Sequence, residues 1–236
     1  MTWSIIARDP VTGHFGVAVT TRSLAVGGLV PHGAGRLGAM ATQARVNPLW
    51  GVDGMRYLAE GRSAGQVVRF LLHPDEGKAK RQMHVIDAEG DTFAYTGAEC
   101  VDWAGHVADE CVSVAGNMLA GRQVVEETLK AYQRNGSLTF GDRLISALDA
   151  GQAAGGDKRG RQSAAIKLWG MEPYAILDLR IDDHPEPLVE LRRLYGLAQQ
   201  RYVVIQAAMA TRANPAGIFD TAERDRMIAE HQAKQT

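Results

Sequence analysis

The sequence predicts an α+β protein with largely antiparallel sheets, stacked in four layers as an α-β-β-α sandwich. Strand-like runs occur as hairpin pairs and helix-like runs as adjacent pairs, and the two kinds are segregated along the chain. Some strand-like runs are apolar on both faces, as expected when other layers cover both sides. The chain has 236 residues, of which 45% are apolar and 22% charged. This composition is sufficient for one packed core.

The first half of the chain shows two hairpins and two short helices. Asp9-Pro-Val-Thr-Gly13 and Ala88-Glu-Gly-Asp91 are turn sequences, each between two strand-like runs. Ser63 and Gln66 have the spacing of a capping box ahead of a helix, and an earlier helix ends at Gly61. The expected strands are residues 3–8, 14–20, 35–41, 82–87 and 92–96, and the expected helices are residues 50–60 and the segment after Ser63.

The second half repeats the pattern with a third hairpin. Ala175, Leu177, Leu179 and Ile181 alternate with a mostly polar set, which favours an antiparallel strand. The expected strands are residues 107–115, 163–169 and 174–182, and the expected helices are residues 118–132, 138–148 and 187–200. We expect residues 1–200 to form the single sandwich domain and residues 201–236 a polar helical extension.

Composition excludes several classes of function. The formal net charge is -1, from 26 basic and 27 acidic side chains, so no overall attraction to nucleic acid or to a membrane surface is predicted. Cys100 and Cys111 lack CxxC spacing, and free thiols are expected. The N-terminus lacks the features of a signal peptide, and no run approaches the roughly 20 apolar residues of a membrane span. We therefore expect a cytoplasmic protein.

The glycine-rich, basic segment from Gly155 to Ser163 is the most site-like stretch, and the glycine-containing run that leads into it begins at Gly151. It resembles a phosphate-binding loop only superficially, because Asp157 interrupts the motif and the segment runs from helix into strand. Its polar side chains could instead clamp a carboxylate and hydrogen-bond an amide of a small-molecule substrate. The alternative is a solvated basic turn. The candidate substrate-binding residues here are Asp157, Lys158, Arg159, Gln162 and Ser163.

Two further positions combine polar side chains with strand ends. Gln43 follows a strand of small residues, with Thr42 before it and Asn47 after it, and Asn117 lies where a strand passes into a helix. Polar groups at the end of a buried strand often line a pocket. The alternative is ordinary capping of the neighbouring elements by Thr42, Asn47 and Asn117.

No metal or other cofactor is expected. Asp182, Asp183 and His184 offer ligand atoms, but neighbouring positions on a strand point to opposite faces and do not converge on one ion. A strand end followed by capping ahead of Pro187 explains these residues better.

Thr2 has the sharpest potential chemistry. Removal of Met1 would expose an α-amine with a pKa near ~7.7 to 8.0, which could act as general base for the threonine's own hydroxyl. Threonine is small enough at position two to permit that removal. Many proteins begin with Met-Thr without any catalytic consequence, so this feature needs support from elsewhere in the chain.

Several strings of the sequence resemble one known family. They include TWSIIARDPVTGHFGVAVTTRS, ATQARVNP, GNMLAG, GGDKRGRQSA and DLRIDDHPEPLVELRRL. Together they resemble the domain of unknown function 1028 family over about residues 2–197. This resemblance implies an N-terminal nucleophile hydrolase-like fold, whose members cleave amide bonds, and places Thr2 at the nucleophile position. The end of the second strand reads Thr20-Thr-Arg-Ser23 without a carboxylate, and no lysine follows nearby, which argues against peptidase activity of the proteasomal type.

The sequence thus predicts an amidohydrolase that cleaves a C–N bond in a small or peptide-like molecule. Thr2 would be the nucleophile, and Thr21, Gln43 and Asn117 would orient its amine or stabilise an oxyanion. Asn47 and the residues of the glycine-rich segment would hold the substrate. The alternatives are a ligand-binding or assembly protein without catalysis, and a hydrolase with an internal nucleophile such as Ser23 or Ser163. We also expect a homo-oligomer.

Overall fold

The computed structural model describes residues 2–233 of the chain. The chain forms two compact units, one ending at Leu191 and the other beginning at Arg192. The division between the two units falls inside a helix.

The first unit contains two antiparallel sheets, as predicted. The larger sheet has the strand order β10-β9-β2-β1-β8-β7, so the N-terminal strand β1 lies between β2 and β8 near its centre. Its strands are β1 (Thr2–Arg8), β2 (Phe15–Thr21), β7 (Gly105–Asp109), β8 (Val112–Asn117), β9 (Ser163–Trp169) and β10 (Ala175–Ile181). The smaller sheet has the order β3-β4-β5-β6. Its strands are β3 (Pro31–Ala34), β4 (Gly38–Ala44), β5 (Arg81–Asp87) and β6 (Thr92–Thr96).

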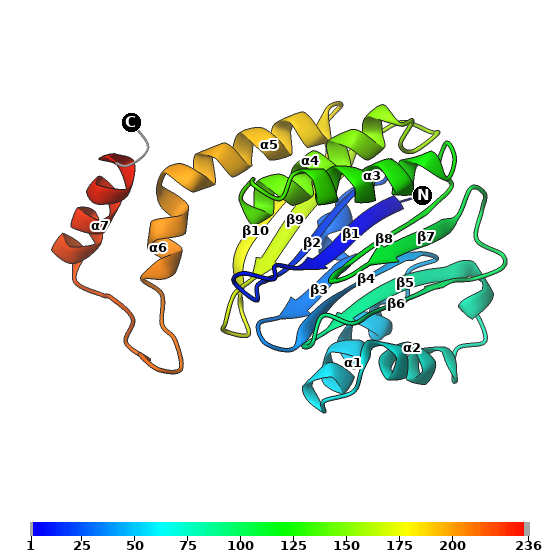
Figure 1. Cartoon of the computed structure of the whole chain (residues 1–236), viewed down its shortest axis with the longest axis horizontal. Coiled ribbons are helices and arrows are strands. Elements are labelled where there is room, and N and C mark those ends of the chain that lie inside the picture. Colours follow the sequence, from blue (N-terminus) through cyan, green and yellow to red (C-terminus); the bar gives the residue numbers. More distant parts are fainter. Residues whose placement is uncertain (1, 234–236) are drawn as a thin grey trace. The chain divides into compact units, whose positions relative to one another are not determined.

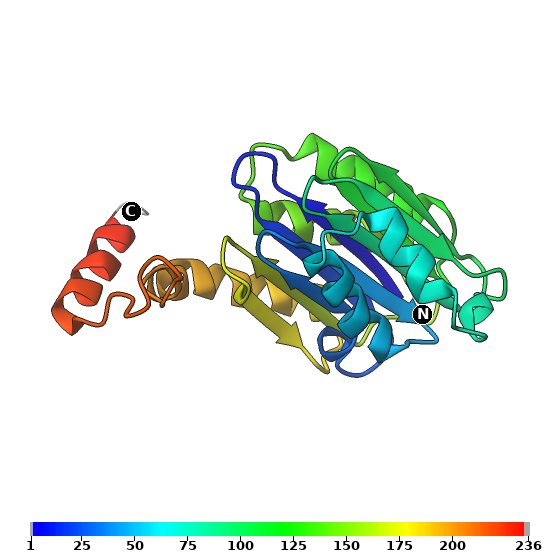
Figure 2. The ribbon, with the colours of Figure 1, turned by 90° about the horizontal axis from the view of Figure 1, so that it is seen from below.

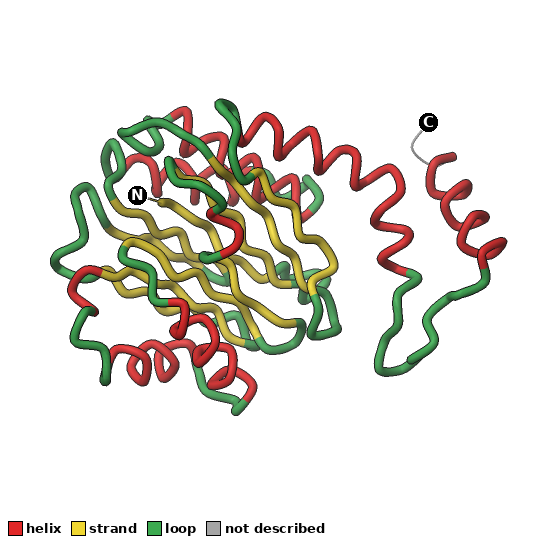
Figure 3. The backbone as a smooth tube through the Cα atoms, turned by 180° about the vertical axis from the view of Figure 1, so that it is seen from behind, coloured by secondary structure: helices red, strands yellow, loops and turns green. Residues whose placement is uncertain are grey.

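Helix pairs cover the outer faces of the two sheets. Helices α3 (Gln123–Arg134) and α4 (Phe140–Ala153) pack on the larger sheet, and α1 (Pro48–Ala59) and α2 (Ala64–Leu72) pack on the smaller one (Figure 1). The view from below shows α1 and α2 lying across the smaller sheet (Figure 2). The view from behind shows the strands of the first unit enclosed between these helices (Figure 3).

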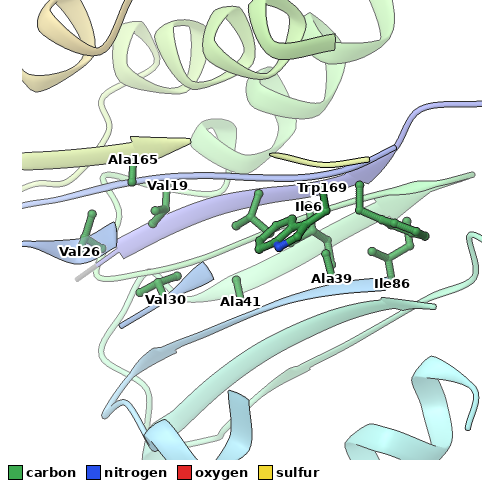
Figure 4. Packing of buried hydrophobic residues seen from close by; sticks show 11 residues of the cluster. Ile6, Val19, Val26, Val30, Ala39, Ala41, Ile86, Ala165 and Trp169 are labelled. Carbon is green, nitrogen blue, oxygen red and sulfur yellow. The ribbon is translucent and has the colours of Figure 1, made fainter. Parts of the chain in front are cut away.

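The apolar half of the inter-sheet layer holds the two sheets together. It contains Ile6 from β1, Val19 from β2, and Ala39 and Ala41 from β4, all buried (Figure 4). Side chains alternate along a strand, so Ile6 faces the second sheet whereas Trp3 and Ile5 face the helices. Each large side chain buried in this layer contributes roughly 1.5–3 kcal/mol to folding. Thr2 and Ser4 share the face of Ile6, and the layer therefore becomes polar toward the start of β1.

Local sequence signals explain several of the element boundaries. The backbone N–H of Ser63 donates to Gln66 Oε1 at 3.0 Å, which confirms the capping box ahead of α2. Pro48 occupies the first turn of α1, where its missing N–H costs nothing, and Asn47 caps this helix. Two short 3-10 turns, at Val26–Gly28 and Lys78–Lys80, complete the connections of the first unit.

Two expectations about the second half were wrong. The strand expected at residues 107–115 is a hairpin, β7 and β8, which turns at Glu110 and Cys111. Cys111 adopts φ 57, a left-handed conformation that glycine or asparagine usually occupies, so the turn had no typical sequence signal. The helix expected from residue 118 begins at Gln123. Before it, Leu119 forms an isolated β-bridge with Asp157, and Ala120 N donates to the carbonyl of Gly156.

The second unit is helical. It comprises the end of α5 (Pro187–Leu197), a π-helical turn (Ala198–Tyr202), α6 (Val203–Ala207) and α7 (Thr221–Ala233). None of the residues of α7 is buried.

Candidate functional site

Thr2 is the first residue of a central strand, and its side chain lies inside the sandwich. Only 8% of Thr2 is exposed. Its Oγ1 hydroxyl donates to Thr21 Oγ1 at 3.2 Å, and Asn117 Nδ2 donates to its backbone carbonyl at 3.4 Å. Strand pairing explains both contacts, because Thr2 lies opposite Asn117 on β8 and Thr21 ends the adjacent strand β2. The structure therefore brings together three of the four predicted catalytic residues by direct contact.

A fully buried amide, Gln82, connects Asn117 to Gln43. Gln82 Oε1 accepts from Gln43 Nε2 at 2.8 Å and from Asn117 Nδ2 at 3.0 Å. Its own Nε2 lies within hydrogen-bond distance of three acceptors, the carbonyls of Gly105 and Gly116 and the hydroxyl of Thr96. Gln82 is thus a hub that fixes the amide of Asn117 beside Thr2.

This network corrects the role expected for Gln43. Both amide hydrogens of Gln43 are used, by Gln82 Oε1 and by the carbonyl of Ala115 at 3.0 Å, while its Oε1 accepts from Ser4 Oγ at 2.8 Å. A side chain with 0% exposure and these partners has no donor for a reacting oxygen. Gln43 therefore positions its neighbours rather than contacting a substrate.

His84 extends the network deeper into the sandwich. Its Nε2 lies 2.8 Å from Ser4 Oγ and its Nδ1 lies 3.1 Å from Ser113 Oγ. Because Ser4 donates its single proton to Gln43, the network assigns the ring proton of His84 to Nε2. Complete burial lowers the pKa of His84 to about 3, with a smaller contribution from nearby His106. His84 is therefore a neutral structural member of this polar layer at physiological pH.

The glycine-rich segment packs against the end of β2. The carboxylate of Asp157 accepts from the backbone N–H of Arg22 at 2.9 Å and from that of Arg159 at 2.8 Å. Asp157 is 4% exposed, and Arg159 also approaches it with its guanidinium at 3.4 Å. The end of β2 has no carboxylate in its own sequence, but Asp157, which is distant in sequence, places one there. Asp157 fixes the loop, and its oxygens are occupied by these donors.

The other residues of the segment divide into buried and exposed groups. Ser163 is buried: its Oγ donates to the carbonyl of Ser23 at 2.5 Å and accepts from Val26 N at 3.2 Å, so it joins β9 to the turn after β2. Gln162 donates its backbone N–H to the carbonyl of Thr21 at 2.8 Å. Lys158 and Arg159 are exposed, and Lys158 Nζ donates to the carbonyl of Asp102 at 2.6 Å. The exposed side chains of Lys158 and Arg159 are therefore accessible to a substrate, whereas Asp157 and Ser163 have structural roles.

Asn47 does not join this group. Its Oδ1 accepts from Leu49 N at 3.1 Å and its Nδ2 donates to Asp75 at 2.9 Å. Both contacts cap and anchor the start of α1, and Asn47 lines a separate hollow beside Trp50 and Tyr57. The capping interpretation is thus correct for Asn47, and its predicted role in substrate binding finds no support in this geometry.

A cavity of about 440 Å³ lies at the ends of β4 and β8, and one of its lining residues is Asn117, whose amide donates to the carbonyl of Thr2. Its volume is in the range of small-molecule sites, about 300–1,000 Å³. Other hollows of about 470 to 500 Å³ are lined by other elements, and none of them includes Asn117. The residues that line the cavity at the ends of β4 and β8 are Ala44, Arg45, Lys80, Glu99, Cys100, Val101, Asn117 and Met118.

Strained backbone marks this cavity. Ala44 has φ 68 and Met118 has φ 56, and each directly follows a buried amide of the network, Gln43 or Asn117. Such conformations are unfavourable for residues other than glycine and concentrate at functional sites. Burial raises the pKa of the Cys100 thiol, so Cys100 is a protonated wall residue rather than a reactive thiolate.

The three residues considered as metal ligands, Asp182, Asp183 and His184, each contact a different partner. Asp182 pairs with Arg180 at 3.0 Å, Asp183 accepts from Gln162 at 3.0 Å, and His184 Nδ1 accepts from Glu186 N at 3.0 Å. Within residues 2–233, no three His, Cys, Asp or Glu side chains gather as metal ligands would. In this same part of the chain, no helix has the length and apolar character needed to cross a bilayer.

Sequence reasoning missed Gln82, Ser4 and His84. The signal was present in Arg81-Gln-Met-His-Val-Ile-Asp87, where Gln82 and His84 alternate with apolar residues of a strand that is buried on both faces. Buried polar side chains need hydrogen-bond partners, so their occurrence in such a strand indicates a second polar surface opposite.

Comparisons with known proteins identify the family but no activity. A family model described as a family of unknown function, DUF1028, matches residues 2–191. The crystal structure of a DUF1028 protein from Silicibacter pomeroyi superposes with a TM-score of 0.85 at 33% identity, covering 93% of this chain and 99% of that chain. Anbu, the ancestral beta-subunit, from Yersinia bercovieri gives a TM-score of 0.41 at 11% identity over 89% of this chain and 98% of that chain.

No curated protein matches the chain. The family model covers nearly all of the first unit, including Thr2, Gln82, Asn117 and the glycine-rich segment. The chain belongs to the DUF1028 family, a family of unknown function.

Proposed function

We propose that the protein is an amidohydrolase that cleaves a C–N bond in a small or peptide-like molecule, with Thr2 as its N-terminal nucleophile. The observation that carries this proposal is the position of Thr2. Its hydroxyl is held by Thr21 and its carbonyl by Asn117, which also lines the adjacent cavity. We assign the four layers to the N-terminal nucleophile hydrolase-like type on the same basis.

The chemistry begins with removal of Met1, which lies outside the described residues. The freed amine of Thr2 takes the proton of the Oγ1 hydroxyl as the oxygen attacks the substrate carbonyl. The same proton is then transferred to the departing amine nitrogen when the C–N bond breaks, leaving an ester on Thr2. Water, deprotonated by the Thr2 amine, cleaves that ester and regenerates the enzyme.

The surrounding residues act mainly by positioning. Thr21 orients the hydroxyl of Thr2, and Asn117 fixes the main chain at the carbonyl. Gln43 and Gln82 hold the amide of Asn117 in turn. Such preorganisation matters because a misplacement of about 1 Å can lower a rate about 100-fold.

The exposed part of the glycine-rich segment would contact the substrate. Among the predicted substrate-binding residues of the segment, Lys158 and Arg159 are exposed and Gln162 is half-buried, whereas Asp157 and Ser163 support the loop from inside. We also propose a cytoplasmic location and a homo-oligomeric state. Size-exclusion chromatography with light scattering tests the oligomeric state.

Turnover of a panel of small amides, ureides and lactams tests the proposal, using protein with a verified N-terminus. Thr2→Ala should abolish turnover, because no hydroxyl is left to attack, whereas Thr2→Ser should retain part of it. Thr12→Ala, the same change in the exposed turn at the other end of the β1–β2 hairpin, is the matched control and should be active. Undiminished turnover by Thr2→Ala would exclude Thr2 as nucleophile and favour Ser23 or Ser163. A panel compound that raises the thermal stability but is not turned over would favour the binding function.

A further inference from the structure

The cavity lined by Asn117 has a charge pattern that the proposed chemistry does not use. Its ionisable lining residues are Arg45, Lys80, Glu99 and Cys100. Burial raises the pKa of the Cys100 thiol and keeps it protonated. The charged lining residues are therefore two cations, Arg45 and Lys80, and one carboxylate, Glu99. The protein as a whole has a formal net charge of -1, so this local excess of positive charge is not a property of the surface in general.

Arg45 is the cation without an acidic partner. Among residues 2–233, no aspartate or glutamate lies within ion-pair distance of its guanidinium. Its backbone is fixed nevertheless: Arg45 N donates to the carbonyl of Lys80 at 3.1 Å, and the carbonyl of Arg45 accepts from Arg81 at 2.7 Å. A fixed backbone limits the entropy lost when the side chain engages a ligand.

Lys80 is paired only weakly. Its ammonium lies 3.5 Å from Glu99, but the two side chains are 61% and 60% exposed. Pairs with this exposure contribute little to stability, so a ligand anion can compete for Lys80. The cavity therefore offers one free guanidinium, which matches a carboxylate by two parallel hydrogen bonds, and a second cation that can be recruited.

The cavity adjoins the site of the proposed chemistry through Asn117. This residue lines the cavity together with Arg45, and its amide donates to the carbonyl of Thr2. We propose that this cavity binds the carboxylate of a small amide substrate, so that the enzyme acts on carboxylate-bearing amides such as dicarboxylic monoamides. That the bound molecule is a substrate rests on the proposed function. Binding of its carboxylate in the cavity does not require catalysis.

Binding of matched probes to the full-length protein tests the inference by calorimetry. The probes are the monoamides of dicarboxylic acids from malonic to adipic acid, each compared with its uncharged diamide and with inorganic phosphate. At least one monoamide should bind about tenfold or more tightly than its diamide, and Arg45→Gln should remove that preference. Glu99→Gln should strengthen monoamide binding, because it removes the competing carboxylate. Arg69→Gln, the same change on the exposed face of α2, should leave all affinities unchanged.

The outcome is separable from that of the proposed function. Thr2→Ala should bind the monoamides like the unmodified protein, so a loss of turnover with intact binding would leave this inference standing. Two results would overturn it: the absence of any carboxylate preference across the series, or a preference that survives in Arg45→Gln. Phosphate that binds as tightly as the best monoamide, and in the same Arg45-dependent way, would overturn the assignment to carboxylates.

Discussion

The carboxylate of Asp157 accepts a hydrogen bond from the backbone N–H of Arg22 at 2.9 Å, across 135 residues of sequence. This contact places the glycine-rich segment at the end of β2, one residue beyond Thr21. Thr21 in turn contacts the hydroxyl of Thr2. The loop is therefore a structural support of the candidate site, in addition to being a surface that a substrate can meet.

Asp157→Asn should destabilise the first unit by about 1–3 kcal/mol, because a buried acceptor of several donors is replaced by a group with one acceptor oxygen. Chemical denaturation measures the change. Asp178→Asn is the control, since Asp178 is 40% exposed in its pair with Lys167 and should contribute less than about 1 kcal/mol. Equal losses in the two variants would show that Asp157 has no special structural role.

Gln82→Met should destabilise the protein by about 2–4 kcal/mol, because the change leaves buried amide hydrogens of Gln43 and Asn117 without their shared acceptor. Thermal and denaturant unfolding measure it. Gln133→Met, at an exposed position of α3, should change stability by less than about 0.5 kcal/mol. A tolerated Gln82→Met would mean that Asn117 is fixed by other contacts.

His84 should make stability depend on pH below about 6.5. Its pKa is lowered from 6.5 to about 3 in the folded protein, so over this window the unfolded chain binds a proton that the folded protein does not. Unfolding free energy should therefore fall as the pH falls, by at most about 1.4 kcal/mol per pH unit from this residue. Above pH 6.5 the effect should vanish.

The comparison of the unmodified protein with His84→Gln isolates this effect, because His14, His32 and His106 also have lowered pKa values and titrate in both proteins. The slope of unfolding free energy against pH should be shallower in the variant between pH 6 and 4. Parallel curves would contradict the assignment of His84 as a buried neutral group.

The layers and most elements could be predicted from local patterns, because hairpin turns, capping residues and apolar periodicity act over short distances. The candidate site could be predicted only in part. Thr2, Thr21 and Asn117 were identified individually, but the contact of Asp157 with Arg22 and the hub at Gln82 depend on how distant strands align. Asn47 was predicted to hold the substrate, and in the structure it caps α1, because the same amide can line a pocket or cap a helix.

The central claim is that Thr2 becomes the N-terminal residue and acts through its own amine. Intact-mass measurement of the protein produced at native levels, supported by sequencing of its N-terminus, tests this most directly. The account predicts a mass lower than that of the full translated chain by one methionine residue, with threonine first. A protein that retains Met1 and still hydrolyses an amide would contradict it.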